Sequence, residues 1–217
     1  MINKKYKCIF IEVPKTGSTS IRGLLGKPFK AHLDVREVKK RLVSQYPYDT
    51  KHYAYYNWIY SKLTSERKKN HTGLKIFDSF FKFGFVRNPW SRTVSLYLRN
   101  QGIQMKDKMS FEEFANWIQL SSDTCKHPSP KKNQLDWFTD DEGKVIVDYI
   151  GRFENLKQDW EYISGKIGLT SSLPHLNRNP MMERKDYRSF YNSNTIEIIH
   201  KKFKTDIVYF DYSFDPR

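Results

Sequence analysis

The sequence predicts a three-layer, P-loop-like α/β fold in which a central parallel sheet is flanked by helices. Three apolar runs of strand length occur along the chain, and each precedes a segment with the periodicity of an amphipathic helix. Strands that alternate with helices are typical of parallel sheets, because parallel strands need a crossover connection. We expect residues 1–217 to form a single domain, which is long enough to bury a substantial core.

The first predicted strand covers residues 6–13, and its helix covers residues 18–25. Gly26 and Pro28 are expected to stop that helix, since glycine suits a helix end and proline cannot continue one. Asp34 is placed to cap a second helix. The apolar face of this second helix comprises Val35, Val38 and Leu42.

The second predicted strand is the run FKFGFV at residues 81–86. Asn88 is a suitable N-cap for the next helix, and Pro89 suits its first turn. Further along, Ser110 and Glu113 have the spacing of a capping box. The helix that they begin carries Phe111, Phe114 and Ile118 at helical spacing.

The third strand is predicted at residues 145–153, after a polar loop at 125–134 that includes Gln134. We expect that loop to be solvated. The helix after this strand has an apolar stripe of Leu156, Trp160, Ile163 and Ile167. A last helix, from about Asn194, is expected to bury Ile196, Ile199 and Phe203.

Composition favours a basic protein that binds an anionic partner. The chain has 38 Lys and Arg against 24 Asp and Glu, a formal net charge of +14, which suits nucleotides, acidic polysaccharides, nucleic acid or anionic lipid. No apolar stretch approaches the roughly 18–20 residues that span a bilayer. Because the first predicted strand follows closely on Met1, we expect no signal peptide. Two cysteines are too few for a disulfide framework or a zinc site. We expect a soluble, cytoplasmic protein.

The segment from Cys8 to Leu25 reads as a strand, a short loop and a helix, and this arrangement builds an anion site. The first turn of a helix leaves backbone N–H groups unpaired, the helix dipole adds partial positive charge, and Lys15 adds a full one. A nucleoside-triphosphate loop reads GxxxxGK[ST], whereas here Lys15 precedes Gly17 and no GK[ST] occurs. The candidate donors to the anion are Thr16, Gly17, Ser18, Thr19 and Ser20.

A second candidate anion site lies at the end of the strand at 81–86. Arg87 leaves that strand end and can bind a phosphate through two parallel hydrogen bonds, and Ser95 adds a hydroxyl two turns into the next helix. Because ligands bind beyond the carboxyl ends of parallel strands, we expect Lys15 and Arg87 to lie at one edge of the sheet. Arg92 is interpreted as a solvated charge on the helix face.

The stretches PKTGSTS and RNPWSRTVS together resemble the sulfotransferase superfamily, which uses 3'-phosphoadenosine-5'-phosphosulfate. PKTGSTS is similar to its 5'-phosphosulfate loop. RNPWSRTVS is similar to its 3'-phosphate segment, in which the arginine and the second serine bind the phosphate; here these are Arg87 and Ser95. The form RNPxxRxVSxY is most similar to the branch that sulfates carbohydrates, including heparan and chondroitin enzymes and short bacterial relatives. Weaker similarity at 148–156 and 173–180 extends the resemblance over most of the chain.

The resemblance implies transfer of a sulfuryl group from that donor to a hydroxyl, without a metal ion. The expected acceptor is an oligosaccharide, a polysaccharide or a glycolipid head group, and neither nucleic acid nor a membrane span is expected as a partner. The resemblance also implies that the loop at 173–180 closes over the nucleotide. Asn177 lies in that loop, and Arg178 is expected to add to the 3'-phosphate site or the acceptor site.

Sulfuryl transfer needs a cation at the departing oxygen and a base for the acceptor proton. Lys15 suits the first role. For the base we favour His32, because it precedes a capped helix near the sheet edge and a neutral histidine accepts a proton near pH 7. The resembled branch carries its catalytic histidine in a similar location. Glu12, next to the loop, is the alternative base.

Two other functions stay open at this stage. A nucleotide kinase on a related fold would consume ATP, and the missing GK[ST] disfavours it. A non-catalytic basic module for glycans or nucleic acid would bind in a strongly salt-dependent way and would not respond to a sulfate donor.

Overall fold

A computed structural model describes most of the chain. The described residues are 1–26, 32–45, 72–98, 109–120, 133–174 and 186–215. They contain a four-stranded sheet whose strands follow one another in chain order: β1 (Ile2–Asn3), β2 (Cys8–Ile11), β3 (Phe81–Val86) and β4 (Tyr149–Arg152). β2, β3 and β4 are parallel, and β1 is antiparallel to β2. The predicted α/β fold with a central parallel sheet is therefore confirmed for β2, β3 and β4, whereas the antiparallel strand β1 was not predicted.

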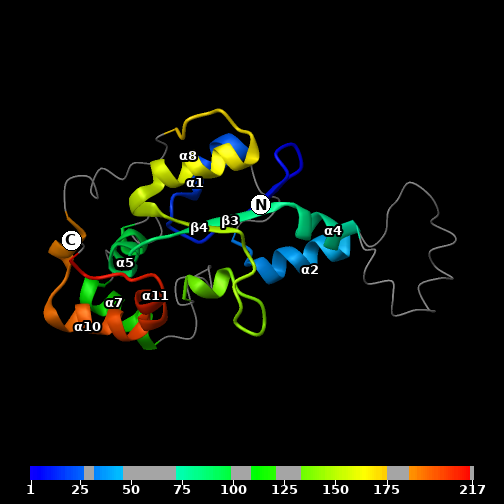
Figure 1. Cartoon of the computed structure of the whole chain (residues 1–217). Coiled ribbons are helices and arrows are strands. Elements are labelled where there is room, and N and C mark those ends of the chain that lie inside the picture. Colours follow the sequence, from blue (N-terminus) through cyan, green and yellow to red (C-terminus); the bar gives the residue numbers. More distant parts are fainter. Residues whose placement is uncertain (27–31, 46–71, 99–108, 121–132, 175–185, 216–217) are drawn as a thin grey trace.

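Helices cover both faces of the sheet (Figure 1). On one face, α1 (Ser18–Leu25) and α8 (Leu156–Ile167) pack against alternate strand residues such as Phe10 and Phe83. On the other face, α2 (Val35–Gln45) and α4 (Thr72–Ser79) pack against Ile9 and Ile11. The strands are buried on both sides, which explains why they read as continuous apolar runs.

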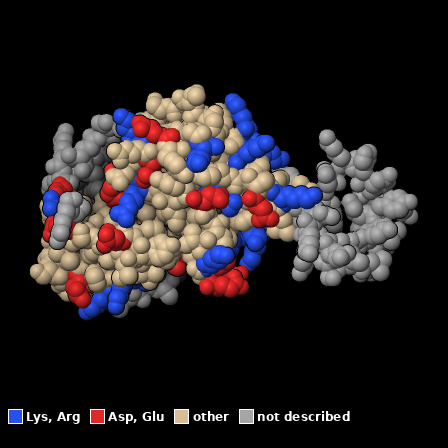
Figure 2. Space-filling view, viewed as in Figure 1, with Lys and Arg blue, Asp and Glu red and all other residues tan. Residues whose placement is uncertain are grey.

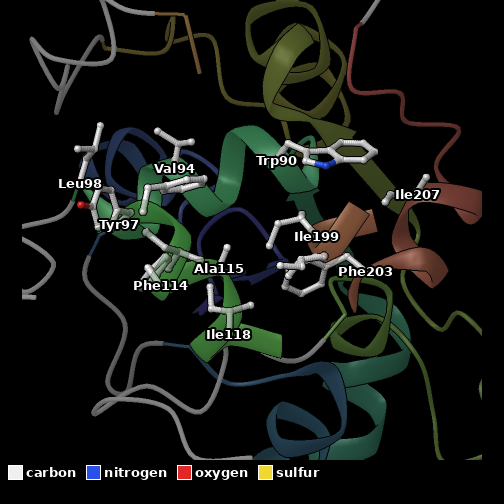
Figure 3. Close-up of a cluster of buried hydrophobic side chains, with 13 residues drawn as sticks. Trp90, Val94, Tyr97, Leu98, Phe114, Ala115, Ile118, Ile199, Phe203 and Ile207 are labelled. Carbon is white, nitrogen blue, oxygen red and sulfur yellow. The ribbon is translucent and has the colours of Figure 1, made fainter. Parts of the chain in front are cut away.

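A third group of helices packs beside the carboxyl end of β3 (Figure 1). It comprises α5 (Pro89–Tyr97), α7 (Phe111–Leu120), α10 (Ser193–Lys202) and α11 (Lys204–Tyr209). Their shared apolar core includes Trp90, Val94, Phe114, Ile199 and Phe203 (Figure 3). Segments from the middle and the end of the chain are thus held around the helix that follows Arg87.

The predicted helix boundaries and caps are largely confirmed. α1 ends at Gly26, whose φ of 94° is readily adopted only by glycine. Asp34 Oδ1 accepts from the Glu37 N–H at 2.9 Å, and Glu37 Oε2 accepts from the Asp34 N–H at 2.9 Å. Asn88 Oδ1 accepts from the first amides of α5. Ser110 and Glu113 form the expected capping box.

Two strand boundaries differ from the prediction. The strand predicted at 6–13 is shorter, because the chain first forms β1 and turns back on itself at residues 4–7. The strand predicted at 145–153 begins only at Tyr149, since Val145 forms an isolated bridge to Thr139. The last helix, predicted from about Asn194, starts at Ser193 as expected, and the separate α11 follows it.

Three short 3₁₀ helices complete the described elements: η3 (Leu135–Trp137), η4 (Phe153–Asn155) and η5 (Tyr187–Phe190). None of the helices in the described ranges has both the length and the apolar character needed to cross a bilayer. The single-domain organisation over residues 1–217 stays a prediction.

Gly84 and Gly165 provide a matched test of this packing. A Cβ at Gly84, in β3, would lie 2.3 Å from Phe138 Cε1 and 2.9 Å from the Ile11 carbonyl oxygen, whereas a Cβ at Gly165, on the exposed side of α8, meets nothing within 4 Å. We expect Gly84→Ala to lower the free energy of unfolding by about 1–3 kcal/mol through overpacking. Gly165→Ala should raise it by about 0.5–1 kcal/mol, because alanine favours the helix. Urea unfolding of both variants measures this, and shifts of the same sign would contradict the packing described.

Candidate nucleotide site at the tips of two strands

The two segments predicted to bind anions meet at one edge of the sheet. β2 and β3 are adjacent and parallel, with Ile11 opposite Gly84. Beyond the strand ends, Nη1 of Arg87 donates to the carbonyl oxygen of Lys15 at 3.3 Å. Nε of Arg92 donates to the carbonyl oxygen of Pro14 at 3.2 Å. The expectation that Lys15 and Arg87 share one sheet edge is confirmed.

The loop between β2 and α1 has an unusual backbone. Lys15 has a φ of 70°, and Gly17, the N-cap of α1, has a φ of 90°. Because glycine has no side chain, the N-cap residue itself gives the first turn of α1 no side-chain hydrogen bond. An anion bound at this end would take the place of a capping side chain and would gain from the helix dipole.

The hydroxyl residues of the loop have different surroundings. Thr16 is fully buried and donates to the carbonyl oxygen of Val13 at 2.9 Å, so its side chain stabilises the turn. Ser18 is buried, and its Oγ accepts from Nη2 of Arg22 at 3.2 Å, which leaves the hydroxyl proton for another acceptor. Ser20 is also buried, whereas Lys15, Gly17 and Thr19 are half-buried. The groups of this loop that suit an anion are therefore the backbone N–H groups and the Lys15 ammonium, more than the Thr16 hydroxyl.

Phe153 contacts both anion segments. A Cβ added to Gly17 would lie 3.3 Å from Phe153 Cδ2 and 3.2 Å from Leu156 Cδ2, so only glycine fits there without displacing these side chains. The guanidinium carbon of Arg87 lies 4.2 Å from the centre of the Phe153 ring, within the range of a cation–π contact. No local sequence signal marks Phe153, because its position depends on how β4 leads into α8.

Arg87 is held rigidly and keeps its charge. Its Nε donates to Ser91 Oγ at 3.0 Å, and the side chain is buried. Burial lowers the pKa of Arg87 to about 10; the negative charge of Glu154 opposes this shift and the positive charge of Arg92 adds to it. Arg87 is still protonated at neutral pH. Ser95 is one turn after Ser91 on α5, on the same face, and is also buried.

Arg92 is not the solvated charge that the sequence suggested. Its side chain is 1% exposed, binds the Pro14 carbonyl, and lies 5.9 Å from the Phe203 ring. Burial lowers its pKa to about 10, and the attraction of Asp206 opposes that shift. The prediction was wrong because nothing local in the sequence shows that α10 and α11 cover this part of α5.

Gln134 was also predicted incorrectly, as part of a solvated loop. Its side chain is fully buried, and both of its polar atoms are bound to the backbone of Arg87. The sequence held no local signal for this contact, because the two residues are 47 positions apart.

His32 lies beside the end of β2. Its Nδ1 is 3.0 Å from the carbonyl oxygen of Glu12, and the side chain is half-buried. A carbonyl oxygen only accepts, so Nδ1 carries the proton in this contact and the neutral ring has its lone pair on Nε2. His32 has a φ of 59°, a conformation that is uncommon outside glycine.

Glu12 faces the core. Its side chain is 1% exposed, on the same side of β2 as Phe10, and neither carboxylate oxygen makes a hydrogen bond within the described residues. Nε of Arg22 lies 3.7 Å from Oε2. Burial raises the pKa of Glu12, and the positive charges of the Met1 amino group and of Arg22 partly oppose this.

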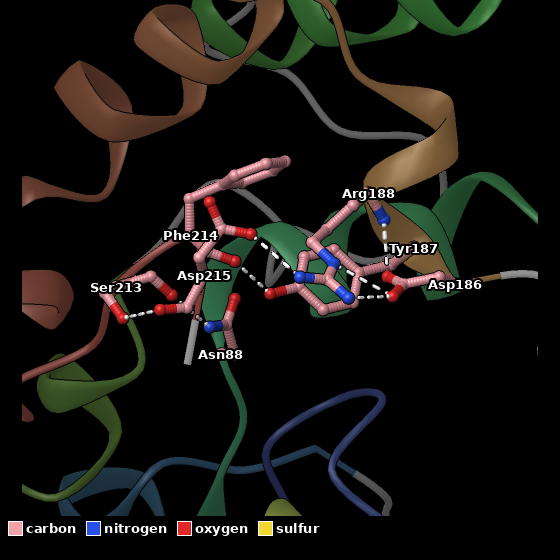
Figure 4. A network of polar contacts seen from close by, with 7 residues as sticks. All are labelled: Asn88, Asp186, Tyr187, Arg188, Ser213, Phe214 and Asp215. Carbon is pink, nitrogen blue, oxygen red and sulfur yellow. Dashed lines mark hydrogen bonds and ion pairs between the residues drawn. The ribbon is translucent and has the colours of Figure 1, made fainter. Parts of the chain in front are cut away.

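The end of the described chain is tied to the start of α5 (Figure 4). Nδ2 of Asn88 donates to the carbonyl oxygen of Ser213 at 2.8 Å, and the Tyr187 hydroxyl donates to the carbonyl oxygen of Phe214. Arg188 pairs with Asp186 and, at 2.9 Å, with Asp215. These contacts fix the last segment beside the residue that follows Arg87.

Two predicted site residues, Asn177 and Arg178, lie outside the described residues, and their roles stay predictions. Within the described ranges, no three His, Cys, Asp or Glu side chains cluster as metal ligands would. Figure 2 shows basic side chains around the β1–β2 turn, where Lys4, Lys5 and Lys7 are exposed. That turn lies at the amino end of β2, away from the loop at its carboxyl end.

Comparison with known proteins agrees with this geometry. A model described as "Sulfotransferase family" matches residues 1–213. A protein of Archaeoglobus fulgidus, described as "Uncharacterized protein", is 37% identical over 107 residues, which are 48% of this chain and 82% of that protein. Its description names no activity, so the family match carries the assignment. With a match over nearly its whole length and both anion segments at one sheet edge, the chain belongs to the sulfotransferase family.

Proposed function

We propose that the protein transfers a sulfuryl group from 3'-phosphoadenosine-5'-phosphosulfate to a hydroxyl of a carbohydrate. One observation carries the proposal: the hydrogen bond from Arg87 Nη1 to the Lys15 carbonyl, which joins the loop of β2 to the tip of β3. The donor has an anionic group at each end of its ribose. Two anion sites on adjacent strand tips match that arrangement.

The residues at the two tips suit the two ends of the donor. The first turn of α1, which receives no side-chain cap from Gly17, suits the 5'-phosphosulfate together with the Lys15 ammonium. Arg87, which stays protonated at neutral pH, and the hydroxyl of Ser95 suit the 3'-phosphate. Because Phe153 packs against both Gly17 and Arg87, it holds these two sites at a fixed separation.

The donor supplies an activated sulfuryl group, and the chain must position it and manage charge and one proton. The Lys15 ammonium is placed to stabilise the negative charge that develops on the departing phosphate oxygen. The α1 amides hold the same end without reorganising during the reaction. Aligning the acceptor oxygen with the sulfur turns a bimolecular step into one within a single complex.

His32 is our choice for the base that removes the acceptor proton. Its ring is held by the Glu12 carbonyl at the end of β2, and this contact leaves the lone pair of the neutral ring on Nε2. Glu12 is the weaker candidate, because its carboxylate is 1% exposed and on the side of β2 that faces α1. A buried carboxylate there cannot reach an acceptor hydroxyl without a large rearrangement.

The proposed acceptor is a hydroxyl on an oligosaccharide, a polysaccharide or a glycolipid head group. The net charge of +14 favours an acidic acceptor of this class, and the similarity of RNPWSRTVS to the carbohydrate branch points the same way. A screen of oligosaccharides for the mass gain of sulfation tests the acceptor. Consumption of ATP with no use of the sulfate donor would instead support a kinase.

Lys15→Ala and Arg87→Ala test the donor site. Lys15→Ala removes a cation from the β2 tip, and Arg87→Ala removes one from the β3 tip. Both variants keep the backbone carbonyl of residue 15. We expect each to weaken binding of adenosine 3',5'-bisphosphate at least about tenfold, which corresponds to about 1.4 kcal/mol. Titration calorimetry measures this, with Lys201→Ala as the control, because Lys201 is exposed on α10 and, among the described residues, forms its ion pair with Glu197 one turn away. Unchanged affinity in the two site variants would refute the donor site.

His32→Ala tests the base. We expect turnover to fall by about 10²–10⁴-fold, the usual contribution of a positioned base, while affinity for adenosine 3',5'-bisphosphate stays within twofold of the parent. Steady-state kinetics and calorimetry on the same preparation separate the two effects. Normal turnover in this variant would place the base elsewhere.

Glu12→Gln tests whether Glu12 has a structural role. The raised pKa of Glu12 means that the folded protein holds this proton at pH values where the unfolded chain has lost it. The stabilising contribution of the protonated carboxyl is therefore complete below the ordinary glutamate pKa and is lost as pH rises through the folded value. We expect Glu12→Gln to raise the melting temperature at pH 8, with little gain at pH 4.5, and to keep turnover. A variant that binds nucleotide but is inactive would make Glu12 the base.

A further inference from the structure

We propose that Gln134 and Asp206 are positioning residues for the nucleotide, which set the geometry of both strand tips from outside the site. This inference rests on the proposed function, because it assumes that Arg87 binds the 3'-phosphate. Neither residue belongs to the two anion segments. Asp206 lies on α11, near the end of the described chain.

Gln134 fixes the backbone of Arg87. Its Oε1 accepts from the Arg87 N–H at 2.9 Å, and its Nε2 donates to the Arg87 carbonyl oxygen at 2.8 Å. Arg87 comes directly after Val86, the last residue of β3 that pairs with β4. The Gln134 amide therefore binds both backbone groups of the residue at which strand pairing stops, as a neighbouring strand would. The direction of the Arg87 side chain depends on this backbone.

Asp206 fixes Gln134 in turn. Its Oδ2 accepts from the Gln134 N–H at 2.7 Å, and its Oδ1 accepts from the Leu135 N–H at 3.0 Å. The Asp206 side chain is fully buried. A buried carboxylate must be compensated by donors, and here these donors are the amides that begin η3. The contact holds Gln134 in place against Arg87.

The same carboxylate also acts on the other tip. Nε of Arg92 holds the Pro14 carbonyl in the loop after β2, and the Arg92 guanidinium lies 5.9 Å from the ring of Phe203, which is one turn before Asp206. From that position the Asp206 carboxylate attracts the buried guanidinium. One side chain on α11 thus acts on the β3 tip through Gln134 and on the β2 tip through Arg92. The two ends of one nucleotide must be bound at a fixed separation. Loss of the Asp206 carboxylate, which acts on both strand tips, should therefore lower the affinity for the nucleotide.

Gln134→Ala and Gln134→Glu test the proposal with two ligands. Adenosine 3',5'-bisphosphate carries the 3'-phosphate, and adenosine 5'-phosphosulfate lacks it. If Gln134 orients Arg87, both variants weaken binding of the bisphosphate at least about tenfold and binding of the 5'-phosphosulfate by a clearly smaller factor. Arg87 is proposed to bind the 3'-phosphate directly, whereas it reaches the loop after β2 through one bond to the Lys15 carbonyl. The glutamate variant keeps the side-chain volume, so it keeps the core filled if the alanine variant does not fold. In an Arg87→Ala background, Gln134→Glu should cause no further loss of bisphosphate affinity.

Asp206→Asn tests the second residue. This variant should weaken the binding of both ligands, since Asp206 supports both tips. Thr195→Ala is the control, because Thr195 is equally buried but its hydrogen bonds stay within the α10 cap. It should leave both affinities unchanged.

Equal losses for both ligands in the Gln134 variants, or a further loss in the Arg87→Ala background, would overturn the positioning role. Unchanged bisphosphate affinity in Arg87→Ala alone would instead overturn the proposed function, so the two failures are distinguishable.

Discussion

The structure of the site depends on two buried arginines that bind the carbonyls of one loop. Arg87 and Arg92 leave the β3 side and hold the carbonyl oxygens of Lys15 and Pro14 on the β2 side. Burying a guanidinium costs on the order of several kcal/mol, so each must be compensated. The loop carbonyls, the rings of Phe153 and Phe203, and the carboxylate of Asp206 supply that compensation. Burial lowers both pKa values to about 10, which still leaves both groups charged at neutral pH.

The helices at the end of the chain are part of this arrangement rather than a separate layer. α10 and α11 pack on α5 and α7 through a continuous apolar core (Figure 3). Arg92, on α5, is 1% exposed and lies beside the Phe203 ring of this core. The segment after α11 continues to the start of α5, where Asn88 binds the Ser213 carbonyl (Figure 4). Most of the contacts that fix the strand tips therefore join residues far apart in sequence. Such contacts form only once the whole described fold is assembled.

The long range of these contacts explains which features could be predicted from the sequence alone. Features set by neighbouring residues were predictable: the strand–loop–helix unit ending at Gly26 and the caps at Asp34 and Asn88. The shared sheet edge for Lys15 and Arg87, which are 72 positions apart, was predictable from the general rule that parallel strands end at one edge. Contacts between particular distant side chains were not predictable. Arg92 looked solvated because α5 alone does not show what covers it, and Gln134 looked like a loop residue because its partner is 47 positions away. The core-facing side chain of Glu12 follows from strand alternation only once the ends of β2 are known.

On the proposed function, the two strand tips bind the two ends of one nucleotide. A crystal structure of the protein with adenosine 3',5'-bisphosphate is the direct test. The 5'-phosphate is expected against the first turn of α1 and the Lys15 ammonium, with the 3'-phosphate within hydrogen-bond distance of the Arg87 guanidinium. A bisphosphate bound with neither phosphate on these groups, or with only one of them engaged, would contradict the proposed function.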